Sequence, residues 1–201
     1  YLDSGNIYAN HGSSSSLYVG RSQLSSTNPS LRTSSLIDID FASLPMPGTY
    51  EVVNASLEMT AVNSNNEVYM TVSEMITSWS ESSSWAYPAG NTSTWQGVGA
   101  YRSADSEIPE TEGVWVNTTG TVALNVTSIV QHALAAGQTG INVIVQPEEI
   151  SGLVAGRVQF ASSEASNIDT RPRLNLTYRL VTPWAVPGPS GLVPADGATL
   201  W

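Results

Sequence analysis

Apolar and polar residues alternate along most of this chain, which is the pattern of strands with one buried face. Segment 36–41 shows it clearly, because three apolar residues fall on one face and two aspartates on the other. Segment 53–59 repeats the pattern, and its inward-facing residues should be Val53, Ala55, Leu57 and Met59. Similar runs predict further strands at residues 7–8, 17–19, 67–72, 121–126, 141–145, 158–161 and 173–180.

One segment has the period of a helix instead. Residues 127–136 place Ile129, His132 and Leu134 near one another, with Thr127 as a cap and Gly137 as the end. About ten strands and one short helix predict an all-β fold, an antiparallel two-sheet β-sandwich of jelly-roll or immunoglobulin-like type. Its core should contain the inward-facing residues Ile37, Ile39, Phe41, Leu57, Leu124, Val126, Leu174 and Leu176.

The composition changes after residue 180. We expect residues 1–180 to form the sandwich and residues 181–201 to form an extended, proline-rich tail. The tail reads either as the start of a following module or as a strand donated to the next copy. Residues 1–3 favour donation, because they look like a first strand without its beginning, which leaves a sheet edge open. The residues that would then anchor the tail are Trp184, Leu192, Val193, Leu200 and Trp201.

Several landmarks recur in a fixed order along the chain. They are RTSSLIDIDF at 32–41, LPMPG at 44–48, YEVVNASLEM at 50–59, WSESSSW at 79–85, FASSE at 160–164 and RPRLNLTY at 171–178. In this order they resemble the disaggregatase-related (DNRLRE) domain family, over residues 1 to about 178. The resemblance implies a secreted, non-catalytic β-sandwich module of a large prokaryotic surface protein. It also implies carbohydrate binding, which some relatives perform.

Composition narrows the classes of function. The 201 residues suit one domain, and a net charge of -10 disfavours nucleic acid and anionic membrane surfaces as partners. The chain has no cysteine, so it forms no disulfide and no thiolate metal site. It contains no apolar run of about 18 residues, the minimum for a membrane-spanning helix. Only 12% of the residues are charged, so solubility must rest largely on serine, threonine and asparagine.

Carboxylates supply the candidates for metal binding. Asp38 and Asp40 share one face of their strand, so they could form one edge of a calcium site or simply face solvent. Calcium is the one cofactor that the sequence suggests. A turn region holds four more carboxylates whose spacing matches no EF-hand, and we interpret it as a charged loop: Asp105, Glu107, Glu110 and Glu112.

Patterns typical of catalysis are missing from the sequence. His11 and His132 lie far apart along the chain, and no serine occurs in a Gly-x-Ser-x-Gly motif. The adjacent Glu148 and Glu149 would face opposite sides of a strand, so they cannot act as a glycosidase pair. We therefore expect a non-enzymatic protein.

Aromatic residues gather in the loop-rich segment 78–106. Tyr87, Trp95 and Tyr101 could form a platform for sugar rings, since sugars stack on exposed aromatic faces. The alternative is that these rings pack over an open end of the sandwich. Trp79 and Trp85 match landmarks of the DNRLRE family, and the resemblance implies a structural role for both.

Two functions remain open from the sequence. The first is an extracellular structural module of a cell-surface, adhesion or filament protein that self-assembles through its tail with copies or adjacent modules. The second is a polysaccharide-binding module of a larger secreted protein. Five Asn-x-Ser/Thr motifs are consistent with a surface glycoprotein, and their candidate asparagines are Asn54, Asn91, Asn117, Asn125 and Asn175.

Overall fold

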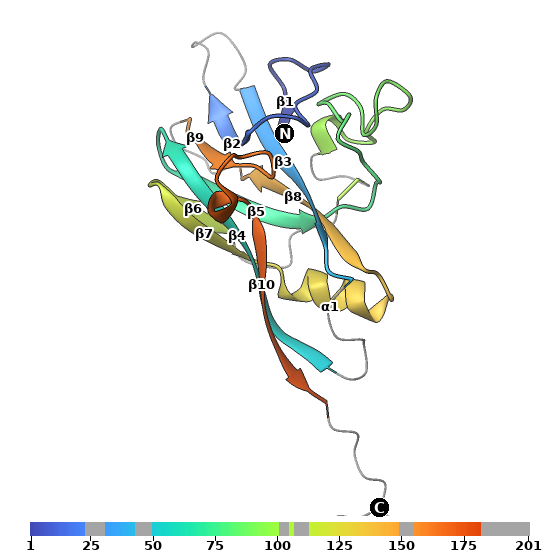
Figure 1. The fold of residues 1–201 in the computed structure, drawn as a ribbon. Coiled ribbons are helices and arrows are strands. Elements are labelled where there is room, and N and C mark those ends of the chain that lie inside the picture. The colour runs from blue at the N-terminus through green and yellow to red at the C-terminus, as the bar shows by residue number, and fades with distance from the viewer. Residues whose placement is uncertain (23–30, 43–49, 101–104, 107–112, 149–154, 182–201) are drawn as a thin grey trace, which may run out of the picture.

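A computed structural model describes residues 1–22, 31–42, 50–100, 105–106, 113–148 and 155–181 (Figure 1). The predicted anchor residues of the tail, together with Tyr101 and three of the four loop carboxylates, lie outside these ranges. The described chain is mostly antiparallel β-structure with one short α-helix, which confirms the predicted all-β class.

Every segment predicted as a strand except residues 7–8 contains one, and one further strand, at residues 114–116, was not predicted. The strands are β1 (Leu2–Asp3), β2 (Ser16–Ser22), β3 (Leu31–Asp40), β4 (Tyr50–Ser64), β5 (Val68–Glu74), β6 (Val114–Val116), β7 (Gly120–Asn125), β8 (Gly140–Pro147), β9 (Arg157–Ala161) and β10 (Arg173–Leu180). The helix α1 (Thr127–Ala135) joins β7 to β8, and two 3-10 turns, Val98–Ala100 and Ile168–Thr170, lie in loops.

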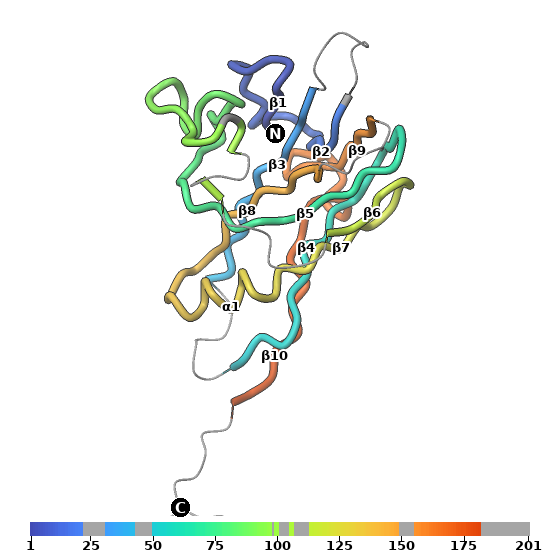
Figure 2. Tube along the Cα trace, turned by 180° about the vertical axis from the view of Figure 1, so that it is seen from behind, coloured from blue at the N-terminus to red at the C-terminus, as the bar shows by residue number. Residues whose placement is uncertain are grey.

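These strands form one continuous curled sheet, a half-barrel, so two separate sandwich sheets are not confirmed. Its order is β10-β4-β9-β2-β3-β8-β5-β6, with β1 added to β3 and β7 added to β4. Strand β3 joins the two halves, because its first part pairs with β2 and its second part, from Ser35, pairs with β8. Figure 2 shows the resulting bend from behind.

The core fills the concave side of this curled sheet. Five of the eight predicted core residues are buried, namely Ile37, Phe41, Leu57, Leu124 and Val126. The other three, Ile39, Leu174 and Leu176, are partly buried and pack against the same cluster. The alternation therefore identified the inward face correctly, although strands β3 and β10 are less deeply covered at these positions.

Strand β4 contains a register shift that the alternation did not predict. Thr177 of β10 pairs with Asn54, whereas the next residue, Tyr178, pairs with Val52. Val53 is therefore an extra residue in a β-bulge, and bulges reverse the side that the following residues face. Val53 is 51% exposed and Val52 is 7% exposed, so the prediction that Val53 points inward is wrong.

The helix begins and ends close to the predicted positions. Gly137, with φ 71°, follows the C-terminus, in the left-handed conformation that glycine adopts readily. At the start, Thr127 is the first helical residue rather than the cap, and its N–H and hydroxyl donate to Asn125 Oδ1 at 3.0 and 2.7 Å. The helix buries Val130 and Ala133 against the core. It is too short to cross a bilayer, and no other described helix is long and apolar enough to do so.

The N-terminal segment differs from the prediction. Ile7 and Tyr8 form no strand; both lie in a turn and are exposed. The first strand is instead Leu2–Asp3, which pairs with β3. A pattern of two apolar residues is too short to distinguish a strand from a turn. The consequence for the site is that residues 4–15 form a loop above the end of β3.

Candidate functional site

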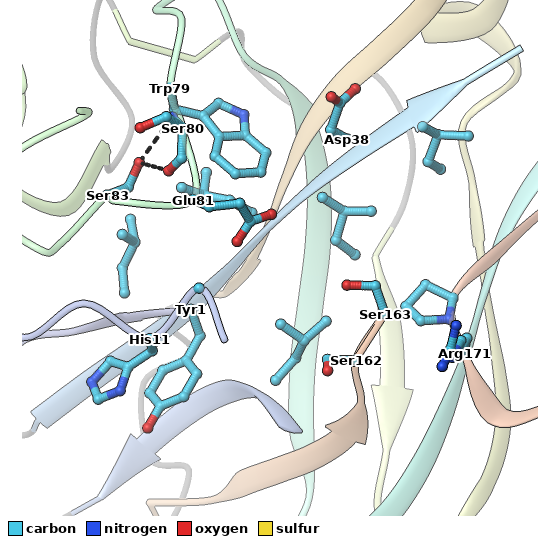
Figure 3. Close-up of a pocket in the computed structure, with 17 residues that line it drawn as sticks. Tyr1, His11, Asp38, Trp79, Ser80, Glu81, Ser83, Ser162, Ser163 and Arg171 are labelled. Carbon is cyan, nitrogen blue, oxygen red and sulfur yellow. Dashed lines mark hydrogen bonds between the residues drawn. The ribbon is translucent and has the colours of Figure 1, made fainter. Parts of the chain in front are cut away.

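A pocket of about 220 Å³ opens where β1, β2 and β3 meet the loops that follow β1, β5 and β9 (Figure 3). Its floor is apolar and comes from the three strands: Leu2, Leu17, Leu36, Ile37 and Ile39. The alternation of β3 places Ile37 on the core side, while Asp38 stands at the rim. The pocket therefore joins an apolar base to a polar mouth.

Charged groups and hydroxyls surround the mouth of this pocket. Figure 3 shows Glu81 and Trp79 on one side and Ser162, Ser163 and Arg171 on the other. The Nε of Arg171 donates to the carbonyl of Ala165 at 2.9 Å, which fixes the guanidinium beside the pocket. Both Glu81 and Asp38 are exposed, so their carboxylates can accept hydrogen bonds from a ligand.

Aromatic rings form part of the pocket wall. Tyr1 and His11 are stacked, with ring centroids 4.1 Å apart and planes 6° from parallel. The edge of Tyr1 also meets Tyr18, and Arg157 lies 4.7 Å above the Tyr18 ring. Burial lowers the pKa of His11 from its usual value, so its ring is neutral at pH 7. This column of rings fixes one wall of the pocket.

Trp79 links the pocket to a second apolar cluster. It packs against seven buried residues that lie apart from the main core: Leu2, Leu36, Met75, Trp85, Trp95, Ala100 and Ile144. Its indole N–H is buried and has no hydrogen-bond partner in the part of the chain that the structure describes. Because this N–H is enclosed by protein atoms, the pocket offers a ligand the ring of Trp79 rather than its N–H.

The loop that carries Trp79 and Glu81 is held in place by Asp105. This carboxylate is fully buried and accepts from the Thr77 hydroxyl at 2.7 Å and from the Gly97 N–H at 2.6 Å. Its backbone carbonyl accepts from the N–H groups of Ile76 and Thr77. The interpretation of Asp105 as part of a solvated charged loop is wrong, because it is an internal hydrogen-bond acceptor.

The loop 4–15 fits closely against the loop at residues 76–100 that carries Trp79 and Glu81, which we call the tryptophan loop. The side-chain amide of Asn10 donates to the carbonyls of Glu81 and Ser83. Gly12 lies so near the Glu81 carbonyl that an added Cβ would overlap the carbonyl oxygen. Glycine is therefore required where the two backbones meet, and the contact holds Glu81 at the mouth of the pocket.

The three aromatic residues expected to bind sugar do not come together at this pocket. Trp95 is buried in the second cluster, and its indole N–H donates to the Ser84 carbonyl at 2.9 Å. Tyr87 is half-buried and stacks on the exposed Tyr8 at 6.0 Å, whereas Tyr101 lies outside the described residues. Trp95 is therefore packed inside the protein, which is the alternative considered for these rings. A role for Tyr87 and Tyr101 in binding stays a prediction.

The calcium candidates Asp38 and Asp40 are both exposed on β3. Only Asp38 lines the pocket, while Asp40 accepts from the Ala42 N–H at 2.8 Å. Among the described residues, no three histidine, aspartate or glutamate side chains are grouped so that they could hold a metal ion. Calcium binding therefore stays a prediction, and the geometry of the described residues adds no support for it.

All five candidate glycosylation sites are exposed: Asn54, Asn91, Asn117, Asn125 and Asn175. Two of them already use their side chains. The Asn125 amide oxygen holds the start of α1, and the Asn175 amide donates to Glu58 at 3.3 Å. Whether any of the five carries a glycan stays a prediction.

No protein-family model matches the chain, and a search of curated proteins finds no match. The resemblance to the DNRLRE family therefore stays a prediction. Sequence reasoning had placed Trp79 in the framework and had not identified Glu81 or Arg171 as site residues. Because these residues lie far apart along the chain, the sequence did not indicate that they line one pocket.

Proposed function

We propose that this protein is a non-enzymatic, extracellular polysaccharide-binding module and that the pocket beside Trp79 binds a sugar unit. The observation that carries the proposal is the combination of an apolar floor, aromatic walls and ionic groups in one pocket. Sugar rings present C–H groups to aromatic and apolar surfaces, and hydroxyl groups to carboxylates and guanidinium groups. Concave sites with a few convergent polar groups are typical of ligand binding.

The charge of the chain indicates which polysaccharides fit. Asp38 and Glu81 stand at the mouth with one guanidinium, Arg171, and the chain carries a net charge of -10. Such a surface repels polyanions such as polyuronates or sulfated glycans. Neutral polysaccharides are therefore the expected ligands, with the ring of Trp79 as the stacking surface for a sugar ring.

Affinity electrophoresis against a panel of neutral and anionic polysaccharides would test this proposal. For the polysaccharide retained best, Glu81→Gln should weaken binding by about tenfold, because it replaces a hydrogen bond to a charged group, of about 1.5–3 kcal/mol, by a neutral one of about 0.5–1.5 kcal/mol. Trp79→Ala should weaken it at least as much, since it removes the stacking face. Calorimetry with a soluble fragment of the same polysaccharide gives the dissociation constants.

Tyr87→Ala is the matched control, because it removes an aromatic ring from the same loop without touching the pocket. Its affinity should equal that of the native protein. Binding that survives Glu81→Gln and Trp79→Ala but is lost in Tyr87→Ala would contradict the assigned site. Assays for new reducing ends should show no release of sugar, as expected for a protein that binds without hydrolysis.

A structural role in a cell-surface or filament protein is the second candidate function. The observation that favours it is that the sheet formed by the described residues is open, with β10 and β6 at its ends and no pairing between them. Open edges carry backbone groups that can pair with another strand. Electron microscopy of the full-length protein tests this function, because serial assembly would produce filaments and a solitary binding module would not.

A further inference from the structure

Within the described residues, the outer edge of β10 has no partner strand along its length. On its inner side β10 pairs with β4 from Arg173 to Leu180. On its outer side the described chain supplies neither a strand nor a backbone hydrogen bond. Figures 1 and 2 both show the ends of β4 and β10 extending as a two-stranded ribbon beyond the rest of the sheet.

Apolar side chains are concentrated on this ribbon. Of the eleven large apolar residues that are exposed in the described chain, five lie at its end: Tyr50, Val53, Tyr178, Leu180 and Val181. Tyr50, Tyr178 and Leu180 lie on one face of the ribbon, where Tyr50 and Tyr178 meet edge to face at 5.3 Å, whereas the β-bulge turns Val53 to the other face. Scattered exposed apolar residues need no explanation, but a contiguous group of them marks a contact surface.

The paired lengths of β4 and β10 are also neutral overall in a strongly acidic chain. Arg173 pairs with Glu58 at 2.7 Å, and Arg179 pairs with Glu51 at 2.6 Å, each directly across the two strands. The hydrogen bond from Arg173 lowers the pKa of Glu58, so this carboxyl stays ionised and paired at neutral pH. Copies with a net charge of -10 repel one another, and a surface of balanced charge lets them approach at the lowest cost.

We propose that two copies of this chain associate through antiparallel pairing of their β10 strands, with Thr177 of each copy at the two-fold axis. This register is self-complementary. It sets Leu180 opposite Leu174 and Tyr178 opposite Leu176 on one face. On the other face Arg179 lies opposite Asn175, so no two arginines face each other. A two-fold contact of this kind satisfies both open edges at once.

This inference does not depend on sugar binding, because the pocket and the ribbon use different residues. It also differs from tail donation, since the pairing strand lies wholly within the described residues. A strand-to-strand contact is small, so the association should be weak and should depend on concentration. Added salt should strengthen it, because salt screens the repulsion between the two acidic chains.

Sedimentation equilibrium of the full-length protein at increasing concentration should show a mass approaching twice the 21.3 kDa of one chain. Replacing both Tyr178 and Leu180 by glutamate should keep the protein monomeric at every concentration. Ile168→Glu is the matched control, since Ile168 is 72% exposed but lies off the ribbon, and this variant should dimerise as the native protein does.

Oxidative cross-linking tests the register, because the chain has no native cysteine. Residues opposite each other in an antiparallel pair have Cα atoms about 4.5–5.5 Å apart, within the range that a disulfide bridges. Thr177→Cys should therefore give a linked dimer, and Ser166→Cys, which is exposed elsewhere, should not. A monomer at all concentrations overturns the proposal, as does a dimer that survives the double glutamate variant. A dimer lost only when residues 183–201 are deleted would assign the contact to the tail instead.

Discussion

Phe160→Ala should lower the free energy of unfolding by about 3–5 kcal/mol. Phe160 is fully buried in the main core, on β9 between Leu17 of β2 and Ala61 of β4. Its truncation removes apolar surface from contact and leaves a cavity that three paired strands cannot close. Urea denaturation followed by circular dichroism measures the loss, provided that the slope with denaturant is unchanged.

Ile168→Ala provides the control for this prediction. Ile168 is also a large apolar residue, but it is exposed, so its truncation should change the free energy of unfolding by no more than about 0.5 kcal/mol. Equal free energies of unfolding for Phe160→Ala and Ile168→Ala would contradict the placement of Phe160 in the centre of the core. Phe41→Ala should fall near Phe160→Ala, because Phe41 is buried in the same cluster.

Asp105→Ala should destabilise the tryptophan loop by about 1–3 kcal/mol. The substitution leaves two half-buried donors, the Thr77 hydroxyl and the Gly97 N–H, without their acceptor, and the loss of a buried acceptor costs about 1–3 kcal/mol. Since Trp79 and Glu81 depend on this loop, we expect sugar binding to be lost as well. Hydrogen exchange of residues 76–100 should accelerate, while exchange in β2, β3 and β9 should change less.

Asp169→Ala is the control for the loss of a carboxylate, because Asp169 is exposed in a short turn. It should leave stability, exchange and binding close to those of the native protein. If Asp105→Ala behaved in the same way, Asp105 would not be the internal acceptor that organises the loop. Tryptophan fluorescence adds an independent signal, since exposure of Trp79, Trp85 and Trp95 would shift the emission to longer wavelength.

The two clusters show why some residues were predictable and others were not. Leu57 and Leu124 lie in regular strands, where a period of two determines which side chains point inward. Trp85 and Trp95 lie in a loop with no period, so their burial depends on contacts with β1, β3 and β8. The loop appeared in the sequence only as an aromatic-rich segment, which fits a binding platform as well as a packed cluster.

The sequence by itself determined the all-β class, the short helix and the inward face of most strands, because these depend on local periodicity. Only the tertiary structure decided that one curled sheet forms, since β3 pairs with β2 over its first part and with β8 over its second. It also decided the pocket. Trp79, Asp38 and Arg171 are distant in sequence, and only non-local strand pairing and loop packing place them around one cavity. The β-bulge at Val53 has the same origin, because it exists only in the register between β4 and β10.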